Sequence, residues 1–361
     1  MKTLRNLFLA CAGLLVCACN NDNEPQIPEG KARVEVRIVP PTVATRATQA
    51  AATTGTDGKL TVTGAYTVTL THNGGAELTE TIQAGAAQKV ATFEDVTSPT
   101  KVTVSLNGGL ASYTASITAE QGALAASAVP AYGETSSFSV SETTTSQSGT
   151  TTTYLASVTM AIPFARLEVG EISLKAGEDN FSTLTVGGVY LDDLRNRGGN
   201  YNAGKFECAA TSTLEYQYGA TENQFGTGVQ AILKDDVSSV NFLTATLPAT
   251  GVYAYNFFGA TSEDAGQKAY NPSFKIYFNA TQVAGQEHIA ATPRYAMIKS
   301  YKKGSSEISL QNGKIYQIVG VEIIDENIVA DEEGAAVQYN VEVQVTEAAW
   351  TIETITADWA Q

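Results

Sequence analysis

The body of this chain is poor in the residues that most metal proteins and many enzymes use. Its 361 residues include four cysteines and two histidines. Three cysteines lie before residue 20, so Cys208 stands alone in the remainder, which excludes an intrachain disulfide and a multi-cysteine zinc site there. His72 and His288 are too far apart for a two-histidine helix motif. No nucleotide-binding or calcium-loop spacing occurs, and we predict a non-enzymatic protein without metal or cofactor.

Charged residues are also scarce, at 16% of the chain against the usual quarter or so, and the net charge is −15. An acidic surface repels phosphate backbones, so nucleic acid is not a predicted partner. Beyond the N-terminus no apolar run approaches the roughly 20 residues of a spanning helix. Threonine, valine and tyrosine instead recur in short runs broken by glycine and asparagine, which predicts an all-β fold.

Residues 1–18 have the layout of a secretory signal, with basic residues followed by an apolar stretch. Residues 16–19 read Val-Cys-Ala-Cys and resemble a bacterial lipoprotein acceptor site, in which the thiol of Cys19 receives a diacylglycerol group and fatty acyl chains such as palmitate. Acylation of Cys17 and a plain secretory signal are the alternatives. The polar stretch 20–28 is typical of a flexible tether. An acyl anchor gains about 0.8 kcal/mol per buried methylene.

Residues 31–39 alternate between apolar and charged side chains, which predicts a half-buried strand. Its apolar face consists of Ala32, Val34, Val36 and Ile38. Two prolines end the strand. The next stretch, 42–58, is long, small and polar, and such loops are where proteases cut. Arg46, followed by Ala47, is a predicted site for an Arg-specific protease; a solvated arginine without a role is the alternative.

The middle of the chain contains two groups of predicted strands, which indicates two small β-sandwiches. The strands fall at 60–70, 78–83, 90–93, 101–106, 113–117 and 136–141, and then at 154–162, 166–174, 181–190, 245–258, 274–280, 295–301 and 315–324. The best helical stretch is 119–129. The threonine-rich run 143–153 is typical of a hairpin tip or an interdomain loop. We place the domain boundary near residue 155.

The C-terminal segment holds two more predicted strands. The apolar positions of the first are Val341, Val343 and Val345; those of the second are Trp350 and Ile352, followed on the opposite parity by Ile355 and Trp359. The change of parity indicates a bulge or register break near Thr354. Large apolar groups this close to a terminus must be buried somewhere. Either the terminal strand docks on its own domain, or it is donated to another subunit.

The order of these parts resembles the FimA-type major fimbrillins, subunits of the type V pili of Bacteroidales. The resemblance rests on a lipoprotein signal, a short first strand, a Thr-Arg-Ala cut site, two β-domains and a Val-x-Val tail with two tryptophans. Residues 162–168 resemble the family's entry to the second domain, and 312–318 resemble the strand before its tail. The threonine-rich run 143–153 has no counterpart in the family pattern.

The resemblance implies two tandem transthyretin-like β-sandwich domains. The expected divisions are 1–18 (signal), 19–46 (tether and removable strand), 47–154 and 155–336 (the two domains), and 337–361 (C-terminal strands with the donor segment). It further implies that a protease cuts after Arg46 and releases the first strand with its lipid. The tail of another subunit then fills the vacated groove, as in donor-strand exchange.

The expected role is therefore the shaft subunit of a cell-surface fimbrium that supports adhesion. Its expected partners are other fimbrial subunits, the Arg-specific protease, and the outer membrane, which holds the lipoprotein precursor before processing. A minor subunit is one alternative, although an anchor should resist cleavage and a tip subunit should lack a donor tail. A glycan-binding outer-membrane lipoprotein is another. It needs an exposed aromatic platform, for which the candidates are Tyr216, Tyr218, Tyr253 and Tyr255.

Overall fold

The structure is a computed structural model that describes most of the chain between residues 32 and 352. The described residues are 32–39, 61–62, 64–84, 90–115, 117–125, 128–146, 149–195, 198–207, 214–215, 233–235, 237, 240–249, 251–259, 271–284, 294–298, 300–303, 306–328, 342–349 and 351–352. Within them the fold is nearly all β, as the composition predicts. The helices are α1 (Ala119–Gly122) and the short η3 (Asp325–Asn327). No described helix has the length and apolar character needed to span a membrane.

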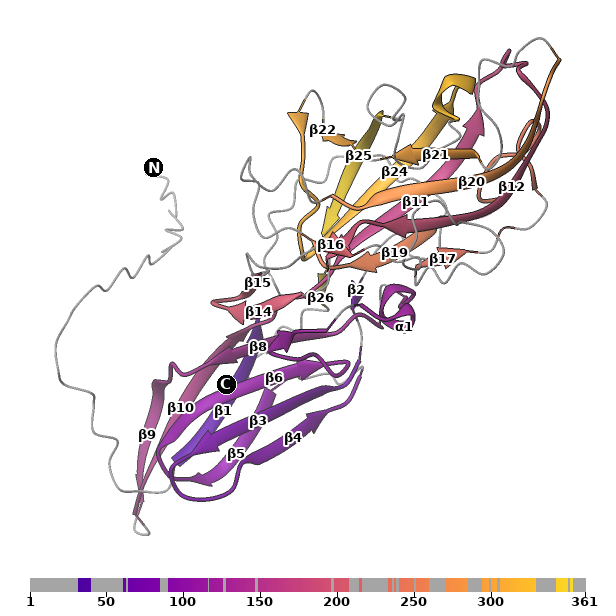
Figure 1. The fold of residues 1–361 in the computed structure, drawn as a ribbon. Helices are drawn as coiled ribbons and strands as arrows, with labels where there is room; N and C mark the ends of the chain where they lie inside the picture. Colours follow the sequence, from indigo (N-terminus) through magenta and orange to yellow (C-terminus); the bar gives the residue numbers. More distant parts are fainter. Residues whose placement is uncertain are drawn as a thin grey trace, which may run out of the picture.

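The first group of strands forms what we call the N-terminal lobe, which occupies the lower part of Figure 1. It has two four-stranded sheets, with strand orders β5-β1-β10-β9 and β4-β3-β6-β8. The strands are β1 (Ala32–Val39), β3 (Tyr66–His72), β4 (Leu78–Ile82), β5 (Val90–Val96), β6 (Pro99–Leu106), β8 (Ala131–Thr135), β9 (Ser139–Ser146) and β10 (Gly149–Thr159). Alternate residues of β3 and β6 are buried, which is the pattern of a sheet with one face on a core.

The second group forms the C-terminal lobe, in the upper part of Figure 1. One sheet has the order β19-β11-β24-β25-β22-β23, and the other has the order β17-β12-β20-β21 with β18 beside β12. The strands are β11 (Ala165–Leu174), β12 (Phe181–Asp192), β17 (Lys234–Asp235), β18 (Val240–Asn241), β19 (Tyr253–Phe257), β20 (Ser273–Gln282), β21 (Arg294–Ile298), β22 (Ser300–Lys303), β23 (Ser306–Glu307), β24 (Lys314–Ile323) and β25 (Glu342–Ala349).

Short strands make up three small ladders. β13 (Leu194–Arg195) pairs with β16 (Leu214–Glu215), and β2 (Thr61–Val62) pairs with β26 (Thr351–Ile352). β14 (Gly199–Asn202) lies between β15 (Lys205–Glu207) and β7 (Ser112–Tyr113). Since β7 precedes the last strands of the N-terminal lobe and β14 follows β12, this last ladder connects the two lobes.

The threonine-rich run is a β-hairpin, because β9 and β10 pair antiparallel from Gly149 opposite Ser146 onward. β10 then continues to Thr159 beside β1. The division expected after residue 154 therefore falls inside a strand of the N-terminal lobe, and the first strand of the C-terminal lobe begins at Ala165. We propose that residues 160–164 mark the division between the lobes.

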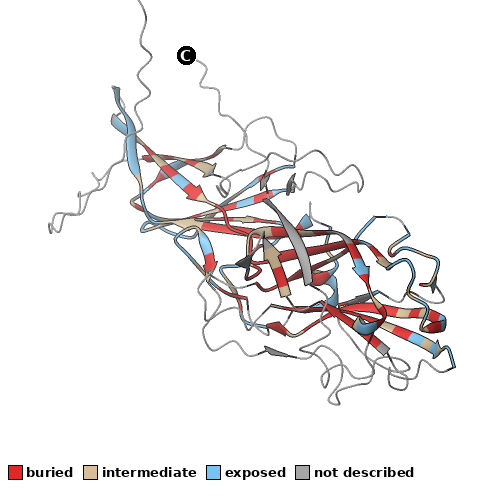
Figure 2. Ribbon diagram, turned by 90° about the horizontal axis from the view of Figure 1, so that it is seen from above, coloured by how far each residue is buried: buried red, intermediate tan, exposed pale blue. Residues whose placement is uncertain are grey.

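The connection between the lobes is itself buried. Phe164 in this segment is fully buried, and Ala161 exchanges two backbone hydrogen bonds with Tyr132. Tyr113 of β7 packs its ring against Phe164 at 5.5 Å between centroids, with Phe206 and Phe258 close by at 5.7 and 6.0 Å. The buried apolar residues of the two lobes thus form one continuous core, whose red bands run through both in Figure 2.

The helical stretch expected at 119–129 is much shorter in the structure. Thr118 caps α1, but the helix ends at Gly122. A Cβ atom on Gly122 would lie 1.9 Å from Cδ2 of Leu233, so any larger residue here would have to displace the Leu233 side chain. The side-chain amide of Asn256, on β19, donates to the backbone carbonyls of Gln121 and Leu124 at 3.0 and 3.1 Å. These carbonyls therefore bond across the junction.

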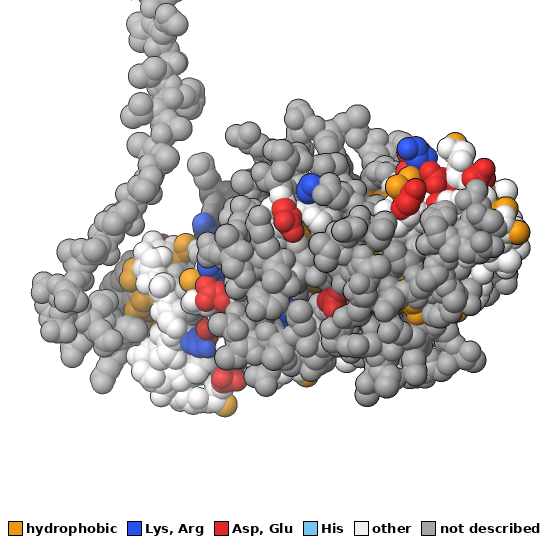
Figure 3. Space-filling model, turned by 45° about the horizontal axis from the view of Figure 1, so that its top comes forward, with side chains coloured by type: hydrophobic (Ala, Val, Ile, Leu, Met, Phe, Trp, Pro, Cys, Tyr) orange, Lys and Arg blue, Asp and Glu red, His pale blue; other side chains and the backbone are white. Residues whose placement is uncertain are grey.

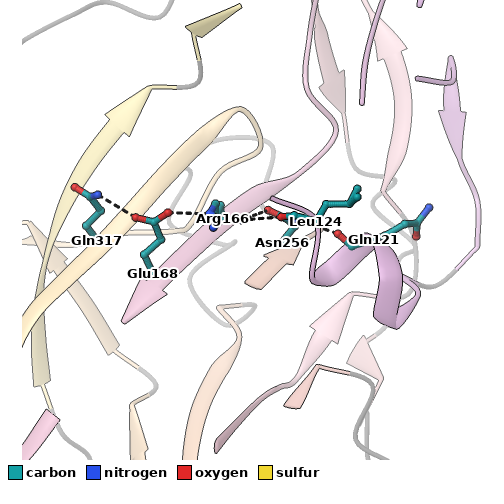
Figure 4. Close-up of polar contacts among 6 residues, drawn as sticks. All are labelled: Gln121, Leu124, Arg166, Glu168, Asn256 and Gln317. Carbon is teal, nitrogen blue, oxygen red and sulfur yellow. Dashed lines mark hydrogen bonds and ion pairs between the residues drawn. The ribbon is translucent and has the colours of Figure 1, made fainter. Parts of the chain in front are cut away.

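A buried charge completes the same junction, and Figure 4 shows its contacts. Arg166 Nε donates to Glu168 Oε1 at 2.8 Å, and Arg166 Nη1 donates to the carbonyl of Leu124 at 2.9 Å. Glu168 Oε2 accepts from the side-chain amide of Gln317, on β24, at 2.9 Å. The Arg166 and Glu168 side chains are each 4% exposed. Burying an ion pair removes both charges from water, so the pair is stable only when additional hydrogen bonds of this kind offset that cost.

Because Arg166 makes these buried contacts, we expect Arg166→Met to destabilise the protein strongly. The substitution leaves the Glu168 carboxylate buried without its cation, which typically costs about 3–5 kcal/mol. We expect a lower urea midpoint in denaturation followed by fluorescence. Lys205→Met is the matched control, because the Lys205–Glu207 pair spans 3.0 Å at the surface and should add little. Equal effects of the two substitutions would contradict the assignment.

Candidate assembly site

Strand β1 lies inside its sheet, between β5 and β10. It runs parallel to β10, with Ala32 opposite Thr152 and Val39 opposite Thr159. On its other side it runs antiparallel to β5, with Arg37 opposite Val90. The strand predicted at 31–39 is therefore present, and both of its edges are hydrogen-bonded to neighbours.

The apolar face of β1 fills a slot between its two neighbours. Ala32, Val34 and Val36 are at most 3% exposed, and Ile38 is partly buried against the same core. We define the β1 slot by the buried residues that lie opposite this face. They are Phe93 and Ala91 on β5, and Tyr154, Ala156 and Val158 on β10. The two alanines stand on either side of Val36, so the smallest wall residues flank the centre of the strand.

The opposite face of β1 is charged, and it contributes less than the apolar face to holding the strand in its sheet. Arg33 forms ion pairs with Glu35 at 3.2 Å and with Glu94 at 3.5 Å. The side chains of Arg33 and Glu94 are 42% and 62% exposed, and ion pairs open to water add little stability. The apolar face and the two backbone ladders therefore hold β1 in place.

The residues expected to be lipidated and cut lie outside the described part of the chain. These are Cys19 in the predicted lipoprotein signal, and Arg46 with Ala47 in the loop after β1. The next described residue after β1 is Thr61, at the start of β2. Lipidation and cleavage therefore stay predictions from the sequence.

The C-terminal segment pairs with its own chain in this structure. β25 lies antiparallel to β24, with Ile318 opposite Val345, and parallel to β22, with Tyr301 opposite Val343. β26 runs parallel to β2, with Ile352 opposite Val62. The other predicted donor residues, Val341, Trp350, Ile355 and Trp359, lie outside the described residues.

Sequence reasoning did not identify the partners of either terminal strand. Alternation predicts that 31–39 and 337–345 are strands, but β1 pairs with a strand more than 100 residues later, and β25 lies inside a six-stranded sheet. The slot residues Ala91 and Ala156 carry no local signal, because only the tertiary structure places them opposite Val36.

A metal site does not compete with the β1 slot among the described residues. No group of three or more histidine, cysteine, aspartate or glutamate side chains there could hold a metal ion. Figure 3 shows one face of the molecule, on which acidic and basic side chains of the described residues lie interspersed. The described residues form no extended basic patch on this face. The β1 slot is thus the best-defined candidate site.

Fold and site together describe a two-lobed, all-β protein whose first strand occupies the interior of a sheet. Comparisons of the sequence with family models and with curated proteins find no match. The structure is similar to that of a candidate cell adhesion protein from Bacteroides eggerthii DSM 20697, with a TM-score of 0.55 and 17% sequence identity over 91% of this chain and 98% of that chain.

It is also similar to a fimbrilin, FimA, from Porphyromonas gingivalis W83. The TM-score is 0.53 and the sequence identity is 12%, over 90% of this chain and 98% of that chain. At these identities the likeness shows that the fold is shared along nearly the whole chain, and nothing more.

Val36→Ala tests how tightly the slot holds β1. Removing two buried carbon atoms from its centre should lower the free energy of unfolding by about 2 kcal/mol, measured by urea denaturation. Glu94→Gln on the neighbouring strand is the control and should change the midpoint little, because Glu94 is exposed. A Val36→Ala protein as stable as the parent would mean that β1 is not packed in the slot.

Proposed function

We propose that this chain is the structural subunit of a bacterial cell-surface fimbrium, of the FimA-type fimbrillin family. It is exported as a lipoprotein through Cys19, reaches the outer membrane, and is cut after Arg46. The processed subunit begins at Ala47, lacks β1, and polymerises when the C-terminal segment of another copy enters the β1 slot. The observation that carries this proposal is the interior position of β1, between β5 and β10.

The slot is suited to such an exchange because β1 precedes every other described strand. A cut in the loop after β1 would separate the strand from the rest of the chain without breaking any described element. Val34 and Val36 are each worth roughly 1.5–3 kcal/mol when fully buried, and each ladder hydrogen bond adds about 1 kcal/mol net. Loss of β1 would expose the apolar residues of both slot walls and leave their backbone groups unpaired, which favours capture of a replacement strand.

The C-terminal segment contains a close copy of β1. Residues 34–38 read Val-Glu-Val-Arg-Ile, and residues 341–345 read Val-Glu-Val-Gln-Val. The two valines match, and the third apolar position differs by one methylene group. This supports a register in which Val341, Val343 and Val345 take the places of Val34, Val36 and Ile38. The later residues Trp350, Ile352, Ile355 and Trp359 would extend the donated segment.

The alternatives are less well supported. A glycan-binding lipoprotein needs exposed aromatic rings, but Tyr253 and Tyr255 are 8% and 4% exposed. Tyr255 also donates its hydroxyl to Asp235 at 2.5 Å. Tyr216 and Tyr218 lie outside the described residues. A minor fimbrial subunit is the second candidate, and the Arg46 loop together with the long tail favours the shaft over an anchor or a tip.

Cleavage of the purified precursor tests the processing step. With an Arg-specific protease we expect a new N-terminus at Ala47, found by N-terminal sequencing, and a ladder of SDS-resistant multimers on gels. Arg46→Lys should resist this protease and stay monomeric. A variant without residues 350–361 should be cut normally but polymerise poorly. A correctly clipped parent protein that stays monomeric would overturn the proposal.

Cysteine cross-linking tests the register of the donated strand. In a Cys208→Ser background, cleaved Ala91→Cys subunits are mixed with cleaved Val343→Cys subunits and oxidised. Ala91 lies opposite Val36, so a donor in the proposed register should give disulfide-linked dimers between the two variants. Gln344→Cys, whose side chain belongs to the opposite face of a strand, is the matched control. Equal yields from positions 343 and 344, in material that does polymerise, would contradict the register.

A further inference from the structure

A lysine and an aspartate meet in the interior of the C-terminal lobe. Lys275 on β20 and Asp192 at the end of β12 have fully buried side chains, and Lys275 Nζ lies 2.5 Å from Asp192 Oδ2. The two strands are antiparallel neighbours, with Tyr190 opposite Lys275 and Asp192 opposite Ser273. Lys275 and Asp192 are therefore diagonal neighbours on one face of the sheet, within reach of a long side chain.

The surroundings of this pair exclude water. The Tyr190 ring lies beside the lysine, with its centroid 5.8 Å from Nζ, and Met297 lies opposite Lys275 on β21. Both neighbours are at most 3% exposed. Burial raises the pKa of the Asp192 carboxyl group, although Lys275 opposes the shift. An ion pair at such a buried position carries a large desolvation penalty, because both charges lose their hydration.

A second carboxyl group lies next to the pair. Asp193 follows β12 with a φ of 57°, a left-handed conformation that few residues other than glycine adopt. Its side chain accepts a hydrogen bond from the hydroxyl of Ser273, the residue opposite Asp192. The charge of Asp193 acts on both Asp192 and the buried Tyr301 hydroxyl. The pair therefore has a second carboxylate nearby, which favours the protonated form of Asp192.

We propose that Lys275 and Asp192 join in an intramolecular amide bond. The lysine first gives one proton to the Asp192 carboxylate, and its neutral amine then attacks Cγ of the protonated Asp192. The Nζ–Cγ bond forms and one Cγ–O bond breaks. From the ion pair, two lysine protons and one carboxylate oxygen leave together as water, and the amide nitrogen keeps the third proton. The step needs no oxidant, reductant or co-reactant.

Two features of the site favour this reaction. Fixed, adjacent partners react as if at very high concentration, since the entropy of bringing them together is paid by the fold. The reaction also replaces two buried charges with one neutral amide, which removes the desolvation cost of the pair. The product covalently connects β12 and β20 across 83 residues of chain. A cross-link over so long a loop restricts the unfolded chain, so the C-terminal lobe should resist heat and force.

Peptide mapping of the purified wild-type protein tests the proposal. We expect tryptic peptide 176–195 joined to peptide 269–294 through Lys275, which trypsin then does not cut, at 18 Da below the summed peptide masses. The linked pair distinguishes this bond from loss of water within a single peptide. Separate, unlinked peptides in folded wild-type protein would overturn the proposal, whether or not the subunit polymerises.

Asp192→Asn is the matched variant, because it is nearly isosteric and forms the same product. It should lose ammonia, 17 Da, and yield the same linked peptides as the parent. Lys275→Met should give only unlinked peptides, and its protein should lose the heat resistance of the C-terminal lobe. Linked peptides in the Lys275→Met protein would show that another lysine is the partner and would also overturn the assignment.

Discussion

The pairing of β1 on both of its edges is the constraint on which the proposed assembly depends. An edge strand can leave a sheet and expose one row of backbone donors and acceptors, but β1 separates β5 from β10. Its removal would leave two facing rows unpaired, together with the apolar walls of the slot, and such rows readily accept another strand. Only a strand with β1's direction can run parallel to β10 and antiparallel to β5 at the same time. The slot therefore selects both the direction and the side-chain size of a replacement.

The proposed donor strand is also paired on both of its edges. β25 lies between β24 and β22 of its own chain, so donating it in full would open the sheet of the C-terminal lobe. Pairing within one chain and pairing between chains use the same groups, and exchange between them resembles domain swapping. In the proposed mechanism cleavage would change this balance, since it would create a vacant slot that the uncut chain does not have. Polymerisation would then be limited by processing.

The junction between the lobes holds them together through several kinds of contact, as the proposed shaft role requires. An aromatic cluster around Tyr113, the ladder between β7 and β14, and the hydrogen bond from Arg166 to the Leu124 carbonyl all connect the two lobes. Asn256 and Arg166 bond to backbone carbonyls of the segment that holds α1, so the lobes share polar as well as apolar contacts. Close-packed interfaces of this kind do not deform continuously.

The sequence by itself determined what depends on neighbouring residues. Alternation showed that Val34 and Val36 face a core, and composition marked the loop around Arg46. Only the tertiary structure decided which strands meet: β10 beside β1, Ala91 opposite Val36, Lys275 beside Asp192. It also ended the helix expected at 119–129 at Gly122, where the carbonyls of Gln121 and Leu124 bond to Asn256 of the other lobe. The physical reason is that the period of a strand is a local property, whereas its partner is selected by packing against residues far along the chain.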